Sequence, residues 1–377
     1  MRIESLRLLA VRNLQPTLLE PSARFNVFSG DNGQGKTNLL EAVFVVATVR
    51  SFRTSQLTEL IGFGAERASI AARVLGHGLY RIYDLELAPG GKKVRLDGKA
   101  VRPLSKYFGD FNVVLFAPED LQIPRGSPAD RRRFLDRAVF NRRTDYLPAV
   151  QRYELALKNR NAVLRKAGEG ALGGAQLADL LDVYDAQLAT LGCEVIASRV
   201  GYLDELRPLV QQSFGEITRA GLTADIDYTC GGESAKAHGT PEPARQLELL
   251  RASRARDLAR QATNVGPHRD DLRFSLEGHD AGSFASQGQL RAIVLAWKTA
   301  ELELLSAKHQ DPPILLLDDV SSELDAQRNR YLFEHLAPRA GQCFITTTHP
   351  GHVLITPGER RDYRVVGGAI SQAETTG

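Results

Sequence analysis

Positions 30–37 read Gly30-Asp31-Asn32-Gly33-Gln34-Gly35-Lys36-Thr37, which fits the pattern G-x-x-x-x-G-K-[ST] in full. An apolar strand is expected directly before this stretch, over 25–28, and a helix directly after it, over 38–46, which is the context that the pattern requires. Glycines allow the backbone to wrap closely around phosphates, and the start of a helix supplies positive potential. In such a loop Lys36 reaches the β- and γ-phosphates and Thr37 binds Mg²⁺. The stretch therefore predicts a nucleotide-binding loop, or P-loop, in an α/β fold.

A second motif supplies the carboxylate that a P-loop requires. The apolar run Ile314-Leu315-Leu316-Leu317 predicts a buried strand and ends at Asp318-Asp319. Asp318 is placed to hold Mg²⁺, directly or through water, and Asp319 to orient or deprotonate the attacking water. The alternative is that the two acids merely end a buried strand and have no catalytic role. The presence of the P-loop makes this alternative the weaker interpretation. The two motifs predict one ATP site built from Lys36 and Asp318, which are 282 positions apart.

Length and composition exclude several classes of protein. The 377 residues suggest two or three structural units, and 43% hydrophobic with 25% charged residues is typical of a globular protein. Three widely spaced cysteines have no zinc-binding spacing, so we expect reduced thiols. Charged residues among the first seven argue against a signal peptide, and the apolar run over 42–49 is far shorter than the roughly 20 residues that cross a bilayer. We expect a cytoplasmic protein without a membrane partner.

The pattern of apolar residues divides the chain into three parts. Residues 1–125 read mostly as strands, including a hairpin at Asp97-Gly98. Residues 126–262 read as helices, with an apolar stripe over 177–195 at spacings of three and four. Residues 263–377 return to alternating helices and strands. We therefore expect an α/β head assembled from both chain ends, with an inserted helical arm domain over 126–262.

Positive charge is concentrated in one segment. Residues 125–166 hold twelve Lys/Arg and four Asp/Glu, a net charge of +8, whereas the other 335 residues carry a net charge of −5. Arg131, Arg132 and Arg133 lie on a helix that Ser127 is expected to cap. Such a segment is the footprint of a polyanion-binding surface, and a solvated helical face would have the same composition. The three arginines are candidate DNA contacts, and contact with the arm remains the alternative.

The motifs that follow the P-loop resemble those of ABC-type ATPases in order and spacing. Ser286-Gln287-Gly288-Gln289 is similar to the signature motif, which caps the γ-phosphate of the partner subunit, so Ser286, Gly288 and Gln289 are candidate nucleotide contacts. Ser321–Asp325 resembles the D-loop, and His349 resembles the catalytic switch histidine at the end of the next strand. Split halves with a helical insertion resemble the SMC-like branch of these P-loop ATPases.

Further segments resemble the RecF family of bacterial recombination mediators over essentially the whole chain. They include Val11-Arg12-Asn13, Ser51-Phe52-Arg53, Phe116–Leu121, the run 126–136 and Gly266–Asp271. The resemblance implies a weak ATPase that uses ATP and Mg²⁺ as a switch, dimerises on ATP, and binds single- and double-stranded DNA at gaps or junctions. It also implies that the protein helps RecR and RecO to load RecA during DNA repair and replication.

The same resemblance places Arg12 and Asn13 beside the nucleotide. For the loop over 266–271 we expect hydrogen bonds to the nucleotide or signature region, because one histidine with neighbouring acids is not a metal site. Two other functions fit the P-loop less well. A transporter-type ABC ATPase is disfavoured by the split motifs and the local basic surface, and a DNA motor is disfavoured because it normally needs two motor lobes and a longer set of motifs.

Overall fold

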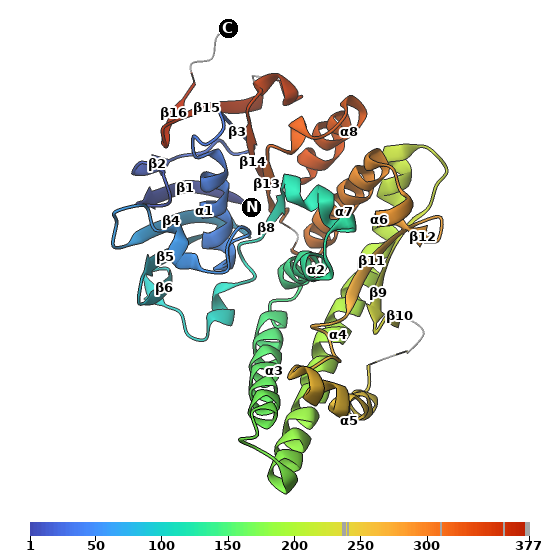
Figure 1. The fold of residues 1–377 in the computed structure, drawn as a ribbon. Coiled ribbons are helices and arrows are strands. Elements are labelled where there is room, and N and C mark those ends of the chain that lie inside the picture. Colours follow the sequence, from blue (N-terminus) through green and yellow to red (C-terminus); the bar gives the residue numbers. More distant parts are fainter. Residues whose placement is uncertain (236–238, 240, 310, 357–358, 374–377) are drawn as a thin grey trace. The chain divides into compact units, whose positions relative to one another are not determined.

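The computed structural model describes residues 1–235, 239, 241–309, 311–356 and 359–373. Its chain forms two compact units. The first unit combines residues 1–121, 213–219 and 287–377, and the second combines residues 122–212 and 220–286. In Figure 1 the first unit contains both the blue N-terminal and the red C-terminal elements. The first unit is thus assembled from both ends of the chain.

These units divide the chain differently from the predicted ranges at two places, besides a shift of the first boundary from residue 125 to residue 121. Strand β11 (Asp271–Leu276) pairs antiparallel with β9 (Ala224–Cys230), so the segment up to Ser286 belongs to the second unit. The end of helix α4 (Gly174–Thr218) belongs to the first unit, where the Gln327 side chain donates to the Ile217 carbonyl at 2.9 Å. Pairing between segments that are distant in sequence sets both boundaries.

A six-stranded sheet, parallel except for one pair, lies in the first unit. Its order is β16-β15-β3-β14-β13-β8, and the β15–β16 pair is antiparallel. Parallel neighbours present their carboxyl ends at one edge, so the segments that follow β3, β13 and β14 meet there. The strands are β3 (Phe25–Ser29), β8 (Val113–Phe116), β13 (Ile314–Asp318), β14 (Gln342–Thr347), β15 (Arg360–Val366) and β16 (Ala369–Gln372).

A second, antiparallel sheet has the order β2-β1-β4-β5-β6-β7. The predicted hairpin joins β6 to β7, and its turn residues Asp97 and Gly98 have φ angles of 52° and 76°, as a tight two-residue turn requires. Helix α1 (Lys36–Thr48) contacts strands of both sheets and is buried on nearly all sides. The strands are β1 (Arg2–Leu9), β2 (Thr17–Leu19), β4 (Ala68–Gly76), β5 (Leu79–Ala88), β6 (Gly91–Leu96) and β7 (Lys99–Ala100).

Helices and short turns complete the first unit. The longest, α7 (Gln287–His309), buries apolar side chains including Trp297. No helix in the described ranges is both long and apolar enough to span a bilayer. The others are η1 (Leu57–Leu60), η2 (Leu104–Tyr107), η5 (Val320–Ser322), α8 (Ala326–Tyr331), η6 (Leu332–Leu336), η7 (Ala337–Arg339) and η8 (Pro350–His352), while η3 (Pro118–Arg125) crosses into the second unit.

The second unit combines helices with a small antiparallel sheet of order β10-β9-β11-β12. Helix α2 (Pro128–Arg142) begins with the predicted cap, in which Ser127 and Asp130 exchange hydrogen bonds between side chain and backbone. Strand β9 lies in the part of the chain that was expected to be helical. The remaining elements are α3 (Tyr146–Gly168), β10 (Glu233–Ser234), α5 (Pro243–Arg260), β12 (His279–Asp280) and α6 (Ala281–Phe284).

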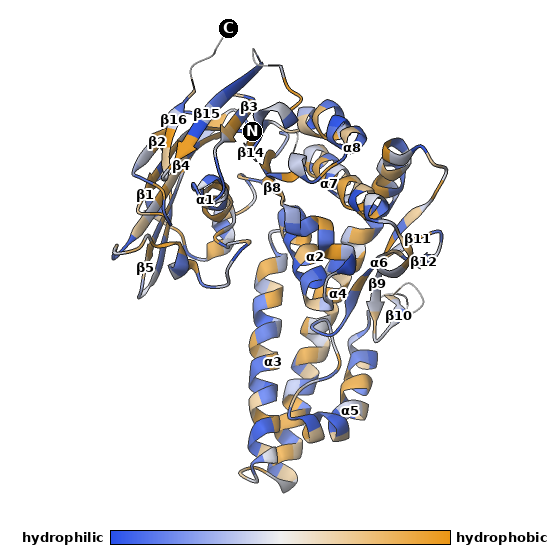
Figure 2. Cartoon of the chain, turned by 45° about the horizontal axis from the view of Figure 1, so that its top comes forward, coloured by the Kyte–Doolittle hydropathy of each residue, from blue (hydrophilic) through white to orange (hydrophobic). Residues whose placement is uncertain are grey.

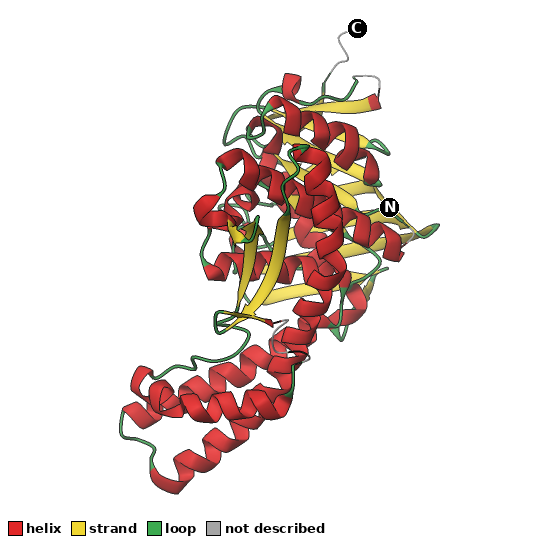
Figure 3. Ribbon diagram, turned by 90° about the vertical axis from the view of Figure 1, so that its right-hand side faces the viewer, coloured by secondary structure: helices red, strands yellow, loops and turns green. Residues whose placement is uncertain are grey.

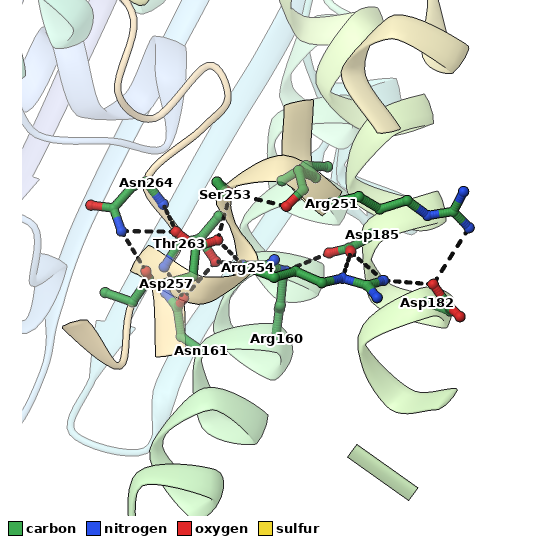
Figure 4. A network of polar contacts seen from close by, with 12 residues as sticks. Arg160, Asn161, Asp182, Asp185, Arg251, Ser253, Arg254, Asp257, Thr263 and Asn264 are labelled. Atoms are coloured by element: carbon green, nitrogen blue, oxygen red, sulfur yellow. Dashed lines mark hydrogen bonds and ion pairs between the residues drawn. The ribbon is translucent and has the colours of Figure 1, made fainter. Parts of the chain in front are cut away.

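Helices α3, α4 and α5 pack together within the second unit. Hydrophobic and hydrophilic residues alternate along α3 (Figure 2), and Leu181 of the predicted stripe packs against Val163 and Leu164. Figure 3 shows these helices lying side by side. At their centre the fully buried Arg160 pairs with the fully buried Asp185 at 2.7 Å and Asp257 at 2.8 Å (Figure 4). One charged cluster therefore ties the three helices to one another.

Candidate nucleotide-binding site

The predicted P-loop connects β3 to α1, and close packing explains its glycines. A Cβ atom at Gly30 would lie 2.3 Å from the Val365 carbonyl oxygen on β15. Gly35 has a φ of 112°, which glycine adopts without steric cost. Gln34 braces the loop, because its carbonyl accepts from the Gly368 amide at 3.0 Å and its side chain accepts from the Gly367 amide at 2.6 Å. The loop is thus held in shape where it leads into the first turn of α1.

The side chain of Lys36 folds back into the P-loop. Its ammonium donates to the carbonyl oxygens of Gly30 at 2.6 Å and Asp31 at 2.9 Å. Burial lowers the pKa of Lys36, and the nearby carboxylates of Asp319, Asp318 and Asp31 oppose this change. The structure therefore brings this cation and the predicted catalytic acids into one electrostatic environment.

Asp318 joins the two predicted motifs. Its Oδ1 atom accepts hydrogen bonds from the hydroxyl groups of Thr37 at 2.9 Å and Thr346 at 2.7 Å. Burial raises the pKa of Asp318, and the two hydroxyl donors partly offset this rise. A hydroxyl and a carboxylate side by side are hard oxygen donors of the kind that Mg²⁺ prefers. The structure thus brings the predicted metal-binding residues Thr37 and Asp318 into direct contact.

Asp319 adopts an unusual backbone conformation at the end of β13. Its φ angle is 49°, and its amide donates to the Thr346 carbonyl at 3.1 Å. Its Oδ1 atom is buried and makes no hydrogen bond with the described residues. A buried carboxylate oxygen without a partner is costly, so it marks a position that carries strain or function. This is the geometry expected of a group that engages water or substrate.

Arg12 and Asn13 contact α1 and the P-loop through their side chains, and their predicted position beside the nucleotide stays a prediction. Arg12 forms a two-point ion pair with the fully buried carboxylate of Glu41 on α1, at 3.0 and 3.1 Å. Asn13 donates to the Gly33 carbonyl at 3.2 Å and accepts from Asn38 at 2.7 Å. Asn13 thereby touches the loop, whereas Arg12 is anchored to the helix behind it.

The signature-like residues lie at the start of α7. Ser286 directly precedes this helix, and Gly288 and Gln289 lie in its first turn. In the D-loop-like segment the Ser322 hydroxyl donates to the Asp319 carbonyl at 2.7 Å, and the Asp325 side chain caps α8. The D-loop segment is therefore bonded directly to the residue with the unpartnered oxygen.

His349 follows β14 at the same edge of the sheet as Asp318. Residues Thr346 and Asp318 are direct partners in the parallel pairing, and His349 is three positions farther along. Its amide donates to the Thr347 hydroxyl at 3.1 Å, and its exposed ring lies 5.4 Å from that of His352. The backbone thus places His349 near the site, and its catalytic role stays a prediction.

Comparison with known proteins identifies the family. The chain matches the model of the RecF/RecN/SMC N terminal domain over residues 2–356. It is 43% identical to the DNA replication and repair protein RecF of Geobacter sp. strain M21, over 98% of this chain and 100% of that protein. The corresponding protein of Myxococcus xanthus is 42% identical over 92% of this chain and 91% of its own length. The chain belongs to the RecF family.

Solved structures agree with this assignment. The recombination mediator protein RecF-ATP in the RecFOR pathway is 30% identical, with a TM-score of 0.87 over 98% of this chain and 97% of that chain. An SmcHead bound to the C-winged helix domain of ScpA shares the fold, with a TM-score of 0.54 at 13% identity. The predicted ABC-type ATPase head with an inserted arm is confirmed, and the protein is a RecF-like DNA replication and repair protein. These findings favour neither a transporter subunit nor a DNA motor.

The three arginines proposed to contact DNA in this RecF-family chain differ in their surroundings. Arg131 pairs with Asp271 at 2.5 and 2.8 Å, and Arg132 donates to the Asp270 carbonyl at 2.8 Å. Arg133 pairs with Asp130 on its own helix, and its side chain is 78% exposed. Arg131 and Arg132 thus hold the second unit together, and Arg133 alone of the three extends into solvent.

Much of the basic segment 125–166 is engaged in the same way. Arg125 donates to the carbonyls of Gly282 and Ala285, both at 3.0 Å, and Arg142 pairs with Glu205 at 2.6 Å. The net charge of +8 over residues 125–166 therefore overstates the free positive charge, because carboxylates and carbonyls from later parts of the chain bind several of these arginines. The basic side chains exposed on α3 are Arg152, Lys158, Arg165 and Lys166.

The loop over 266–271 is a hydrogen-bonding centre of the second unit. His268 is bonded through Nδ1 to the Tyr153 hydroxyl at 2.6 Å and through Nε2 to the Thr263 carbonyl at 3.0 Å. Arg199 donates to the Pro267 carbonyl at 2.7 Å. These contacts lie within the second unit, and contact of the loop with the nucleotide or signature region stays a prediction. Burial lowers the pKa of His268 to about 4, so its ring is neutral near pH 7.

Proposed function

We propose that this RecF-family protein binds DNA under the control of ATP, in the cytoplasm, and acts with RecR and RecO in loading RecA. The observation that carries the proposal is the 2.9 Å hydrogen bond between Thr37 and Asp318, which unites the P-loop with a carboxylate 281 positions away. Such a pair has a clear use in a site for a nucleotide with its metal ion. The RecFOR pathway named for the related RecF-ATP structure supports the choice of partners.

Each residue of the site has a definite task in this proposal. Lys36 neutralises the β- and γ-phosphates, and the loop amides and the start of α1 hold their oxygens. Thr37 and Asp318 would bind Mg²⁺, which supplies positive charge as the γ-phosphate leaves. No group of three His, Cys, Asp or Glu side chains in the described ranges could hold a metal by itself. Phosphate oxygens and water molecules would complete the coordination.

Hydrolysis depends on the residues around the γ-phosphate. Asp319 is the proposed general base, because its buried Oδ1 has no hydrogen-bond partner within the part of the chain that the structure describes, and because it follows Asp318, the proposed metal ligand. His349 is proposed to contact the γ-phosphate or the attacking water from the adjacent strand end. A carboxylate shorter than glutamate at position 319 is consistent with slow turnover, which suits a switch.

Dimerisation explains the signature motif. Ser286, Gly288 and Gln289 are proposed to close over the nucleotide of a second copy, as in ABC-type ATPases. The γ-phosphate would then favour the dimer, and hydrolysis would release it. Gapped DNA or a junction is the proposed ligand of the dimer, bound chiefly through its phosphates.

The proposal can be tested by sedimentation of the purified protein with ATP, with ADP and without nucleotide, in the presence and absence of a gapped duplex. Wild-type protein should dimerise and bind the duplex tightly in the presence of ATP, but not with ADP or without nucleotide. Ser286→Arg should bind ATP as a monomer, but it should neither dimerise nor bind the duplex tightly, because a large cation would occupy the interface. Ser371→Arg on β16 serves as the control of equal size and charge. Normal dimerisation of Ser286→Arg would refute the assignment of the signature motif.

A further inference from the structure

Arg328 of α8 lies against the signature residue Gly288. A Cβ atom placed on Gly288 would lie 3.1 Å from Nη2, 3.3 Å from Nη1 and 3.4 Å from Cζ of Arg328. Three such similar distances mean that the guanidinium group covers the position that a side chain would take. A side chain at position 288 would therefore displace the guanidinium by a few tenths of an ångström, so glycine allows this close packing within the chain. Figure 1 shows α7 and α8 as neighbours within the first unit.

The guanidinium is fixed from the side of the D-loop. Nη1 of Arg328 forms an ion pair with Oδ2 of Asp325, whose Oδ1 accepts from the Arg328 amide at 3.0 Å. Nε of Arg328 is buried without a hydrogen-bond partner among the described residues. A separate ion pair connects the two segments directly, because Arg291 of α7, three residues after Gly288, contacts Glu323 at 3.3 Å. This ion pair and the packing of the Arg328 guanidinium over Gly288 therefore join the D-loop segment to the signature helix.

Apart from the ion pair with Asp325, the surroundings of Arg328 are electrostatically unfavourable for a cation. The start of a helix carries partial positive charge, so a cation beside the first turn of α7 is repelled. Burial lowers the pKa of Arg328, and the charge of Arg291 lowers it further. An arginine whose only task was to cap or solubilise α8 would extend into solvent, as the exposed Arg330 does on the same helix. The electrostatic cost of burying the guanidinium beside the start of α7 indicates that the contact between Arg328 and Gly288 has a function.

We infer that Arg328 is a positioning residue that fixes the signature motif relative to the D-loop, so that both reach the partner subunit as one rigid surface. The inference rests on the proposed ATP-dependent dimer. The D-loop is bonded to Asp319 through Ser322. The contact of Arg328 with Asp325 and Gly288 therefore connects the signature motif of a subunit with that subunit's own proposed catalytic carboxylate. Arg328 would thereby link the two ATP sites of the dimer without touching either nucleotide.

The test compares Arg328→Gln, Asp325→Asn and their combination. Glutamine removes the guanidinium, and asparagine removes the ion pair while keeping the side-chain oxygen that caps α8. Both variants should bind ATP as monomers with unchanged affinity. Loss of one charged hydrogen-bonded contact should weaken ATP-dependent dimerisation about tenfold to a hundredfold. The double variant should dimerise as well as either single variant, because each single change already breaks the same contact between Arg328 and Asp325.

Arg330→Gln provides the matched control on the same helix and should dimerise as wild type does. Arg328→Lys should remain impaired, because a single ammonium cannot both cover Gly288 and pair with Asp325 in the planar geometry of arginine. Wild-type dimerisation by Arg328→Gln, loss of its monomeric ATP binding, or additive effects in the double variant would each overturn the inference. Failure of the wild-type protein itself to dimerise with ATP would instead overturn the proposed function, and this inference with it.

Discussion

Replacing Arg160 by methionine tests the buried cluster that joins α3, α4 and α5. Arg160, Asp185 and Asp257 have no solvent exposure in their side chains, so the guanidinium compensates two carboxylates that water cannot reach. Methionine keeps most of the side-chain volume and removes the charge. The change therefore leaves two buried negative charges with fewer partners, while the packing of the three helices is largely retained.

The magnitude follows from the contacts that the carboxylates keep. Breaking a buried ion pair by removing one partner costs about 3–5 kcal/mol. Asp257 keeps hydrogen bonds from Ser253 at 2.9 Å and from the amide and side chain of Asn264 at 3.1 and 2.8 Å, and Asp185 keeps its ion pair with Arg254 at 2.7 Å. We therefore expect the lower end, about 3 kcal/mol. For a unit of this size, that corresponds to a Tm lower by about 6–12 °C.

Thermal unfolding of the full chain, followed by calorimetry, measures the effect. Arg152→Met is the control on the same helix, because Arg152 contacts Glu194 at 2.8 Å with a side chain that is 59% exposed. Exposed pairs contribute about 0–1 kcal/mol, so this Tm should hardly change. Changing Asp185 and Asp257 to leucine in the Arg160→Met background should restore much of the stability. Equal stability of Arg160→Met and Arg152→Met would refute the reasoning.

Two further outcomes concern hydrolysis and pH. Asp319→Asn should keep ATP binding and slow phosphate release by about 10²–10⁴-fold, because an amide cannot accept the proton of water. Unchanged turnover would exclude Asp319 as the base. The pKa of His268 is about 4 in the folded protein and about 6.5 in an unfolded chain, so its stabilising contribution is present above pH 6.5 and is lost as the pH falls toward 4. Between pH 7.5 and pH 5, unfolding measurements should show wild type losing about 2 kcal/mol more than His268→Gln, and equal losses would contradict the assignment.

The nucleotide site could be predicted from sequence because its motifs are local. The P-loop needs glycines, lysine and threonine at fixed spacing, and Asp318 needs only to end a buried strand. Sequence order also showed that both chain ends form the head. Glu41 was missed because it lies on α1 among buried apolar residues, and nothing along the chain shows that it holds Arg12. Its partner lies 29 positions away and is brought near by the folding of the sheets.

The second unit was harder to predict for the same reason. The charge of the segment 125–166 suggested a surface, yet Arg131 is neutralised by Asp271, which is 140 positions away. Strand β9 pairs with the two-residue strand β10 next to it in sequence, but its longer neighbour β11 begins only at Asp271. Long-range pairing therefore decides both the boundary of this unit and the fate of its arginines, and single-sequence patterns carry little information about it.

The position of β3 between β14 and β15 affects how the protein is made on the ribosome. Residues 25–29 leave the exit tunnel early, but both of their neighbours in the sheet lie within residues 342–366. The arm, whose strands pair with one another, can fold while the head still waits for its last strands. During this interval the apolar residues Phe25, Val27 and Phe28 lack their final cover and are expected to need protection from aggregation. A nonsense mutation ahead of β14 is therefore expected to abolish ATP binding, although every residue of the P-loop has been synthesised.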